Sequence, residues 1–270
     1  MQKVIDIIEK SIDVPFGFCP FSEVAEHLLD CRAKSRLPKD AKTVICFAFP
    51  YKVEDKAPKN ISRYAAVPDY HEICGNLLAA LAEKLRGEAG CEFEYFVDNS
   101  PIPEVFAAAR AGLGVIGENG LLITEQYGSF VFIGEIVTDM ELCGDKGEIA
   151  RCSACGACKK ACPVGLSKSE CLSAVTQKKK PLSMDEQKLI RENGSVWGCD
   201  ICQNVCPMNS GTQKTKIPEF LEGYRDSYER GEDISGRAYC WRGEAVISRN
   251  SLLFENIADV IAPDTPASNR

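Results

Sequence analysis

The sequence predicts an α/β (α+β) fold with an added cysteine-rich module. Apolar runs of strand length alternate with segments of helical periodicity up to residue 138, which is typical of a sheet covered by helices. From about Gly144 the sequence becomes rich in Cys, Lys and Gly, and past Ser210 it is polar with helical periodicity. These changes in composition divide the chain into an α/β domain at residues 1–146, a cysteine-rich module at 147–212 and a short helical region at 213–270 with a disordered end at 263–270.

The first half of the α/β domain contains three expected helices and a central strand. Residues 1–10 place apolar side chains at helical spacing, and a second helix is expected after Ser22. Residues 43–49 form an uninterrupted apolar run, which predicts a buried central strand. A longer helix is expected over residues 69–86, where leucines recur at helical spacing ahead of Gly90.

The pattern of strands and helices continues in the second half. The expected elements are a strand over residues 93–97, a helix over 103–111, two strands over 121–124 and 129–138 joined around Gly128, and later helices around 218–230 and 247–260.

Eight cysteines form two runs and one isolated position. The first run has the spacing C-x2-C-x2-C-x3-C and is followed by Pro163, a bacterial ferredoxin pattern in which the fourth thiolate binds the other of two [4Fe-4S] clusters. The second run has the spacing C-x2-C-x3-C and is followed by Pro207. Crossing the ligands in the ferredoxin manner assigns one cluster to Cys152, Cys155, Cys158 and Cys206, and the other to Cys162, Cys171, Cys199 and Cys202.

Other uses of these cysteines are possible but weaker. Cys143 competes with Cys171 for the eighth position, because the second run lacks an early cysteine. Two C-x2-C pairs are able to hold zinc, but three cysteines at successive x2 spacing, with Pro after each run, favour cubanes. A disulfide framework is disfavoured because the spacing is tight and no export signal is found. Most of the seven remaining cysteines are expected to be small buried side chains.

The net charge of −7 is unevenly distributed along the chain. Residues 151–216 carry +6 and the remainder −13, so the module suits an anionic partner, either nucleic acid or an acidic electron donor. Alternatively, the lysines at 178–180 only solvate a loop. No signal-peptide core and no apolar run of about 18 residues is found, so we expect a cytoplasmic protein without a membrane partner.

Residues 112–117 contain a formal G-x-G-x-x-G. A dinucleotide site needs this motif to leave a strand and open a helix, whereas here a helix is expected before it and a strand after it. The glycines therefore suit either close approach of the backbone to a large flat ligand or a tight connection.

Asp98 follows an expected strand and precedes a proline-bounded turn. Such a carboxylate is able to project into a cleft and to act as a general acid if partial burial raises its pKa. Alternatively it forms an Asx turn or a helix N-cap ahead of Pro101. His27 is expected on a solvated helix surface, and His71 is expected to have a structural role at a helix start.

The sequence resembles the epoxyqueuosine reductase family from about residue 43 to residue 209. The resemblance rests on several motifs in order, which include Asp69-Tyr70-His71, Val97-Asp98 with Pro101 and Glu104, residues 111–119, Tyr127-Gly128-Ser129, Gly134-Glu135-Ile136, the two cysteine runs, Cys171 and Asn209. Glu118 stands where the family usually has Lys, Val115 where it has an aromatic residue, and Met208 where it has Trp.

The resemblance implies a nitroreductase-like cobalamin-binding sheet domain followed by a ferredoxin-like double [4Fe-4S] module, in a monomer. It implies Asp98 as the proton donor, favours Cys171 over Cys143 as the eighth ligand, and leaves His71 as a weaker candidate for a cobalt ligand. The cobalamin contacts that it implies are Asp98, Gly112, Gly114, Gly117, Asn119, Ser129, Gly134 and Glu135.

The implied function is reductive removal of the epoxide oxygen of epoxyqueuosine in tRNA to give queuosine. Electrons would come from a low-potential donor of the flavodoxin or ferredoxin type. About 60 residues follow Pro207, so the resemblance implies a short form without most of the family's C-terminal helical repeats. Two alternatives are a corrinoid and iron–sulfur reductase acting on a small molecule, as in dehalogenation, and a ferredoxin-like electron carrier without its own substrate.

Overall fold

The computed structural model describes residues 1–142 and 149–261, and an antiparallel sheet organises its first half. Four strands lie in the order β1-β2-β6-β3, and each neighbouring pair is antiparallel. Their bounds are β1 Phe16–Pro20, β2 Thr43–Pro50, β3 Phe93–Val97 and β6 Val131–Thr138.

Strand β2 is the buried centre of this sheet. All eight of its residues are buried, because β1 and β6 flank it and helices cover both faces. The register pairs Thr43 with Thr138 at one end and Pro50 with Val131 at the other. The expected central strand over residues 43–49 is thus confirmed.

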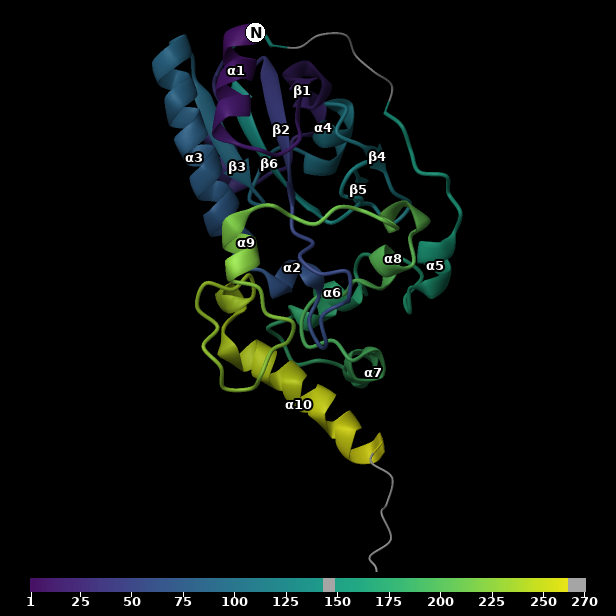
Figure 1. The fold of residues 1–270 in the computed structure, drawn as a ribbon. Coiled ribbons are helices and arrows are strands. Elements are labelled where there is room, and N and C mark those ends of the chain that lie inside the picture. The colour runs from purple at the N-terminus through teal and green to yellow at the C-terminus, as the bar shows by residue number, and fades with distance from the viewer. Residues whose placement is uncertain (143–148, 262–270) are drawn as a thin grey trace, which may run out of the picture.

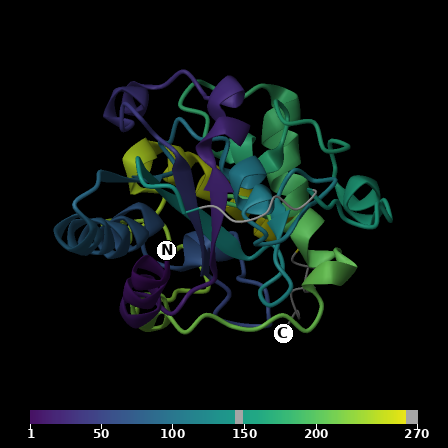
Figure 2. The same ribbon diagram turned by 90° about the horizontal axis from the view of Figure 1, so that it is seen from above.

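Helices pack on the two faces of the sheet (Figure 2). Helices α1 (Gln2–Ser11) and α3 (Tyr70–Ala89) share one apolar cluster with Phe47, while α4 (Glu104–Arg110) shares another with Cys46. The expected helices over residues 1–10, 69–86 and 103–111 are confirmed. Helix α3 begins at Asp69, whose carboxylate accepts a hydrogen bond from the backbone N–H of residue 71, and it ends at a left-handed glycine, residue 90.

In the α/β domain one expected helix is absent, and one expected strand is present but lies in a different sheet. After Ser22 the chain forms 3-10 turns instead of a helix, because the N–H of Leu29 donates to the carbonyl of Pro101 instead of closing a helical turn. The strand expected over 121–124 pairs in a separate two-stranded sheet and not with β6. The elements concerned are η1 Phe21–Glu23, η2 Ala25–His27, η3 Arg32–Arg36, β4 Val115–Ile116 and β5 Leu122–Ile123.

The second half of the chain is made of short helices and loops. Figure 1 shows the sheet at one end of the molecule and α6, α7 and α10 at the other. The bounds are α2 Arg63–Ala66, α5 Ala157–Ala161, α6 Leu172–Thr176, α7 Met184–Asn193, α8 Ile201–Asn204, η4 Pro207–Asn209, α9 Pro218–Glu222, η5 Cys240–Arg242 and α10 Glu244–Ile261.

The C-terminal region packs beside residues 59–69. The N–H of Asp69 donates to the carbonyl of Gly236, and the N–H of Arg225 donates to that of Ala66, both at 2.8 Å. The helix expected over 218–230 therefore ends at Glu222, because the chain beyond it runs alongside the segment before α3. The expected helix over 247–260 is confirmed within α10.

Three expectations concern residues outside those that the structure describes. These are the proposed disorder at 263–270, the boundary between residues 146 and 147, and the competing cluster ligand Cys143. Among the described helices, none combines the length and apolarity that a bilayer crossing needs.

Candidate active site

A cavity of about 530 Å³ lies where the α/β domain meets the cysteine-rich module. His71 and Asp98 line it from the α/β domain, and Cys171, Cys199 and Cys202 line it from the module. Much of the remaining wall is aromatic and comprises Tyr51, Tyr64, Tyr70, Phe132, Trp197 and Trp241. An apolar cavity of this size with a few polar groups suits a large, mostly flat ligand.

Asp98 and His71 meet at this cavity. The backbone of Asp98 has φ +57, a conformation rare for a residue other than glycine, and it directly follows β3. Its carboxylate lies 3.2 Å from Nε2 of His71, whose Nδ1 lies 2.7 Å from the carboxylate of Asp69. The imidazole also stacks on Tyr70, with ring centroids 4.1 Å apart. The two carboxylates and the stacked ring fix the orientation of the imidazole.

The proton of this pair resides on the histidine. Burial alone would lower the pKa of His71, but hydrogen bonds to Asp69 and Asp98 outweigh it and raise the pKa to about 9. The hydrogen bond from His71 lowers the pKa of Asp98, against a smaller effect of burial. The expectation that burial raises the pKa of Asp98 was therefore wrong, since the Asp98 side chain is 63% exposed and faces a cation.

The residues expected to contact cobalamin divide into two groups. Asp98, Asn119 and Ser129 line the cavity. The other five do not line it: Gly112, Gly114, Gly117, Gly134 and Glu135.

Packing explains why glycine occupies two of these positions. A Cβ on Gly134 would meet Leu78 at 2.7 Å, because α3 crosses the sheet there. A Cβ on Gly117 would collide with the side chain of Asn119, so this glycine lets Asn119 take its place between the cavity and the module. The glycine motif follows α4 and contains β4, so it does not leave a strand and open a helix as a dinucleotide site does.

Four cysteines line a second, smaller pocket in the module. They are Cys152, Cys155, Cys158 and Cys206, and Glu118, Asn119 and Met208 lie beside them. The backbone N–H of Glu118 donates to Sγ of Cys152 at 3.3 Å. Hydrogen bonds of this kind to cluster sulfurs tune reduction potential, so the Glu118 side chain need not be a cation for its backbone to serve the site.

The other four expected ligands lie toward the central cavity. Cys171, Cys199 and Cys202 line it, and the charges of Cys162 and Cys171 act on Cys202. Burial, with the neighbouring thiols, raises the pKa of Cys199 to about 12. Among the described residues, no three or more His, Cys, Asp or Glu side chains converge closely enough for a single metal ion.

A buried hydrogen-bond network joins the module to the sheet. The amide of Asn209 donates to the hydroxyl of Ser129 and accepts from its backbone N–H, both at 2.8 Å. The hydroxyls of Ser129 and Tyr51 both donate to Gln203, at 2.9 and 3.2 Å. All four residues lie in segments that resemble the family, but only Ser129 was expected to contribute to the site. Tyr51 directly follows the buried strand β2, and a polar residue at the end of a buried strand indicates the edge of a domain.

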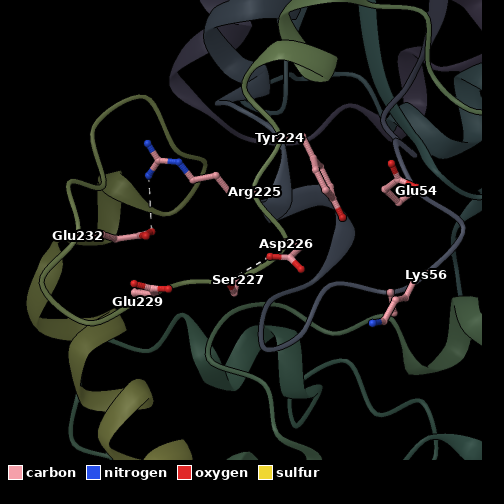
Figure 3. Close-up of a pocket in the computed structure, with 9 residues that line it drawn as sticks. Glu54, Lys56, Tyr224, Arg225, Asp226, Ser227, Glu229 and Glu232 are labelled. Carbon is pink, nitrogen blue, oxygen red and sulfur yellow. Dashed lines mark hydrogen bonds and ion pairs between the residues drawn. The ribbon is translucent and has the colours of Figure 1, made fainter.

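A further cavity of about 510 Å³ lies away from these residues, between the loop after β2 and the loop after α9 (Figure 3). Its wall is mostly charged, and Arg225 and Glu232 form an ion pair of 3.8 Å within it. Figure 3 shows Glu54 and Lys56 on the opposite side from Glu229 and Glu232. None of the expected site residues lines this cavity, and we assign no ligand to it.

Two known families match separate parts of the chain. Residues 32–99 match the family described as epoxyqueuosine reductase QueG, DUF1730. Residues 151–209 match the 4Fe-4S double cluster binding domain, so the module takes two [4Fe-4S] clusters as cofactors.

Relatives and solved structures agree with these matches. Epoxyqueuosine reductase of Lactococcus garvieae is 34% identical over 82% of this chain and 71% of its own length, and that of Leadbetterella byssophila is 36% identical over 83% and 79%. The structure of epoxyqueuosine reductase from Streptococcus thermophilus aligns with a TM-score of 0.76 at 25% identity, over 95% of this chain and 81% of that one.

A structure of epoxyqueuosine reductase with an epoxyqueuosine-modified tRNA stem loop has the same fold, with a TM-score of 0.79 at 22% identity, over 95% of this chain and 80% of that one. Since the identity to curated relatives exceeds 30% and the alignment covers more than two thirds of their length, the chain belongs to the epoxyqueuosine reductase family.

Proposed function

We propose that this oxidoreductase removes the epoxide oxygen of epoxyqueuosine in tRNA and leaves an alkene. The reaction takes up two electrons and two protons and releases the oxygen as water. The observation that carries the proposal is the central cavity, where the Asp98–His71 pair and three cluster cysteines face one space. Proton supply and electron supply thus converge there, as a reductive removal of oxygen requires.

We further propose that cobalamin occupies the central cavity, which is consistent with this family. When bound, it would supply a low-potential centre that passes electrons from the clusters to the substrate. Asp98 would lie against the departing oxygen, with the proton of His71 reaching that oxygen through the Asp98 carboxylate. The aromatic wall would exclude water, and Asn119 and Ser129 would hold polar groups at the rim of the corrin.

Anaerobic reconstitution tests this proposal. We expect about eight irons per chain, a bound corrinoid in the visible spectrum, and conversion of epoxyqueuosine-containing tRNA when a low-potential reductant is present. Eight irons without corrinoid would support a ferredoxin-like electron carrier. Corrinoid uptake with turnover of a halogenated small molecule, but not of the tRNA, would support the dehalogenase-like alternative.

The partners follow from the charge distribution and the reaction. We infer that tRNA approaches the basic module, which carries +6 over residues 151–216, and that the donor is an acidic protein of the flavodoxin or ferredoxin type. We also infer that the protein acts as a monomer in the cytoplasm, where these partners occur.

Trp241 is a candidate platform for an RNA base at the rim of the cavity. Its side chain is 52% exposed, although tryptophan is usually buried, and the Arg242 guanidinium lies 3.7 Å from its ring centroid. Stacking of an unpaired base on an aromatic ring contributes about 1–3 kcal/mol. We therefore expect Trp241→Ala to weaken binding of a tRNA stem loop about tenfold or more at constant salt.

Met184→Ala is the matched control, because this residue is an exposed apolar side chain on α7 outside the cavity. Titration of a fluorescent stem loop measures both variants. Equal affinities for the two variants would show that Trp241 does not contact the RNA.

A further inference from the structure

Two carboxyl groups, one buried and one half-buried, lie close to Asp98. Glu104 is the first residue of α4, and Glu135 lies in β6 opposite Cys46 of β2 and Phe96 of β3. Glu135 is fully buried, and both of its carboxyl oxygens lack a hydrogen-bond partner among the described residues. One carboxyl oxygen of Glu104 is likewise buried without a partner, while its carboxyl group accepts a hydrogen bond from the backbone N–H of Asp98.

The described residues around these two carboxyls offer them little charge compensation. His71 on α3 faces Glu104, and Asp98, in the loop after β3, faces both carboxyl groups. The hydroxyl of Ser100 lies beside Glu135 but outside hydrogen-bond geometry. Arg110, two turns along α4, pairs instead with Glu23 at 2.9 Å. An ionised carboxylate without a partner in such a place costs several kcal/mol, so Glu135 retains its proton. For Glu104 this cost is smaller, because the N–H of Asp98 remains its partner.

The direction of the pKa shifts agrees with this geometry. Burial, with a further contribution from the charge of Asp98, raises the pKa of Glu104 to about 8. Burial and the neighbouring Glu104 raise the pKa of Glu135 well above its ordinary value. At neutral pH two acidic protons therefore lie next to the residue at which the reaction consumes protons.

Packing gives no reason for acids at these positions. The layer between the sheet and α4 is otherwise apolar and includes Ile102, Ala107 and Ala108. Apolar side chains of similar volume would avoid the cost of burying polar groups without partners. A role in proton transfer accounts for what packing does not.

We propose that Glu104 and Glu135 form a proton store that resupplies the Asp98–His71 pair during turnover. The inference rests on the proposed function, in which each epoxide consumes two protons and the pair holds one. The second proton moves from the Glu104 carboxyl to the Asp98 carboxylate, and no electrons move with it. Glu135 then returns the proton to Glu104, and solvent refills the store through the exposed side chain of Asp98.

Infrared spectroscopy of the full chain tests the store without any substrate. The wild type is expected to show carboxylic acid C=O bands at neutral pH, one lost in Glu104→Gln and another in Glu135→Gln. The Glu104 band should disappear as the pH rises through about 8. Absence of these bands from the wild type would overturn the inference, and this measurement does not depend on the folding of any variant.

Single-turnover kinetics of the reconstituted enzyme tests the supply of protons. Glutamine at position 104 keeps an oxygen for the N–H of Asp98 but cannot transfer a proton. We expect Glu104→Gln to lower the rate about tenfold near neutral pH, and less near pH 6, where the higher proton concentration speeds proton uptake from solvent. A pH–rate profile identical to that of the wild type would reduce Glu104 to a structural role and overturn the proposal.

The two experiments separate this inference from the proposed function. If the carboxylic acid bands are present but the protein does not convert the tRNA, the proposed substrate is wrong, and Glu104 and Glu135 are still protonated. If the protein converts the tRNA but shows no such bands, the proposed proton store is wrong and the proposed function still stands.

Discussion

Replacing Asp98 by Asn is expected to lower the rate of epoxide reduction about 100-fold or more while cofactor binding is retained. Asparagine has the same shape and accepts the hydrogen bond from His71, but it cannot pass a proton to the departing oxygen. It also tolerates the left-handed backbone found at this position, where φ is +57. The loss should therefore reflect chemistry and not a change in the loop.

The same variant should alter the pH dependence of the reaction. The hydrogen bond and negative charge of Asp98 help to raise the pKa of His71 to about 9, so the histidine is protonated below that pH and loses its proton above it. Without the charge, this pKa falls and the alkaline loss of activity should begin at lower pH.

Asp139→Asn is a suitable control for this variant, because Asp139 accepts a hydrogen bond from Glu92 at the far end of the sheet and does not line the cavity. Single-turnover rates with pre-reduced enzyme measure the effect. If Asp98→Asn turned over as fast as the control with the same corrinoid spectrum, Asp98 would not be the proton donor.

Replacing Cys171 by Ser is expected to remove one complete cluster, so that bound iron falls from about eight to about four per chain. The structure places Cys171 on the wall of the central cavity with Cys199 and Cys202. Loss of this cluster should abolish turnover, since electrons would no longer reach the cavity from the first cluster.

Cys143→Ser discriminates between the two candidates for the eighth ligand. We expect it to keep about eight irons and normal activity, and Cys91→Ser, outside the module, serves as a control for loss of a thiol. Iron counting and EPR of the reduced proteins measure all three. Four irons in Cys143→Ser with eight in Cys171→Ser would reverse the assignment.

The regular elements of the α/β domain were predictable because their patterns are unambiguous. Strand β2 is apolar throughout and β3 lies between clear turn signals, so sequence and structure agree there. Strand β1 escaped prediction because it is short and contains Gly17 and Pro20. Its glycine is explained only by tertiary structure, since a Cβ there would collide with the backbone of Ala111.

The site was predictable only where its residues are close in sequence. The cysteine runs carry their own spacing, which is why their grouping was expected before the fold was known. The aromatic wall joins positions as distant as Tyr51 and Trp241, and no local period connects them. The pKa of Asp98 had the opposite direction from that expected because it depends on His71, a contact that only the fold creates.

The wall of the central cavity has a consequence for the order of biosynthesis. The four-stranded sheet is complete at Thr138, whereas Trp241 and Gly236, whose carbonyl accepts a hydrogen bond from Asp69, come about 100 residues later in the sequence. Because domains fold as units while the chain emerges from the ribosome, the sheet is able to form first and leave the cavity open on this side. The clusters and a large flat cofactor then have time to be inserted before the segment around Trp241 closes this side of the cavity.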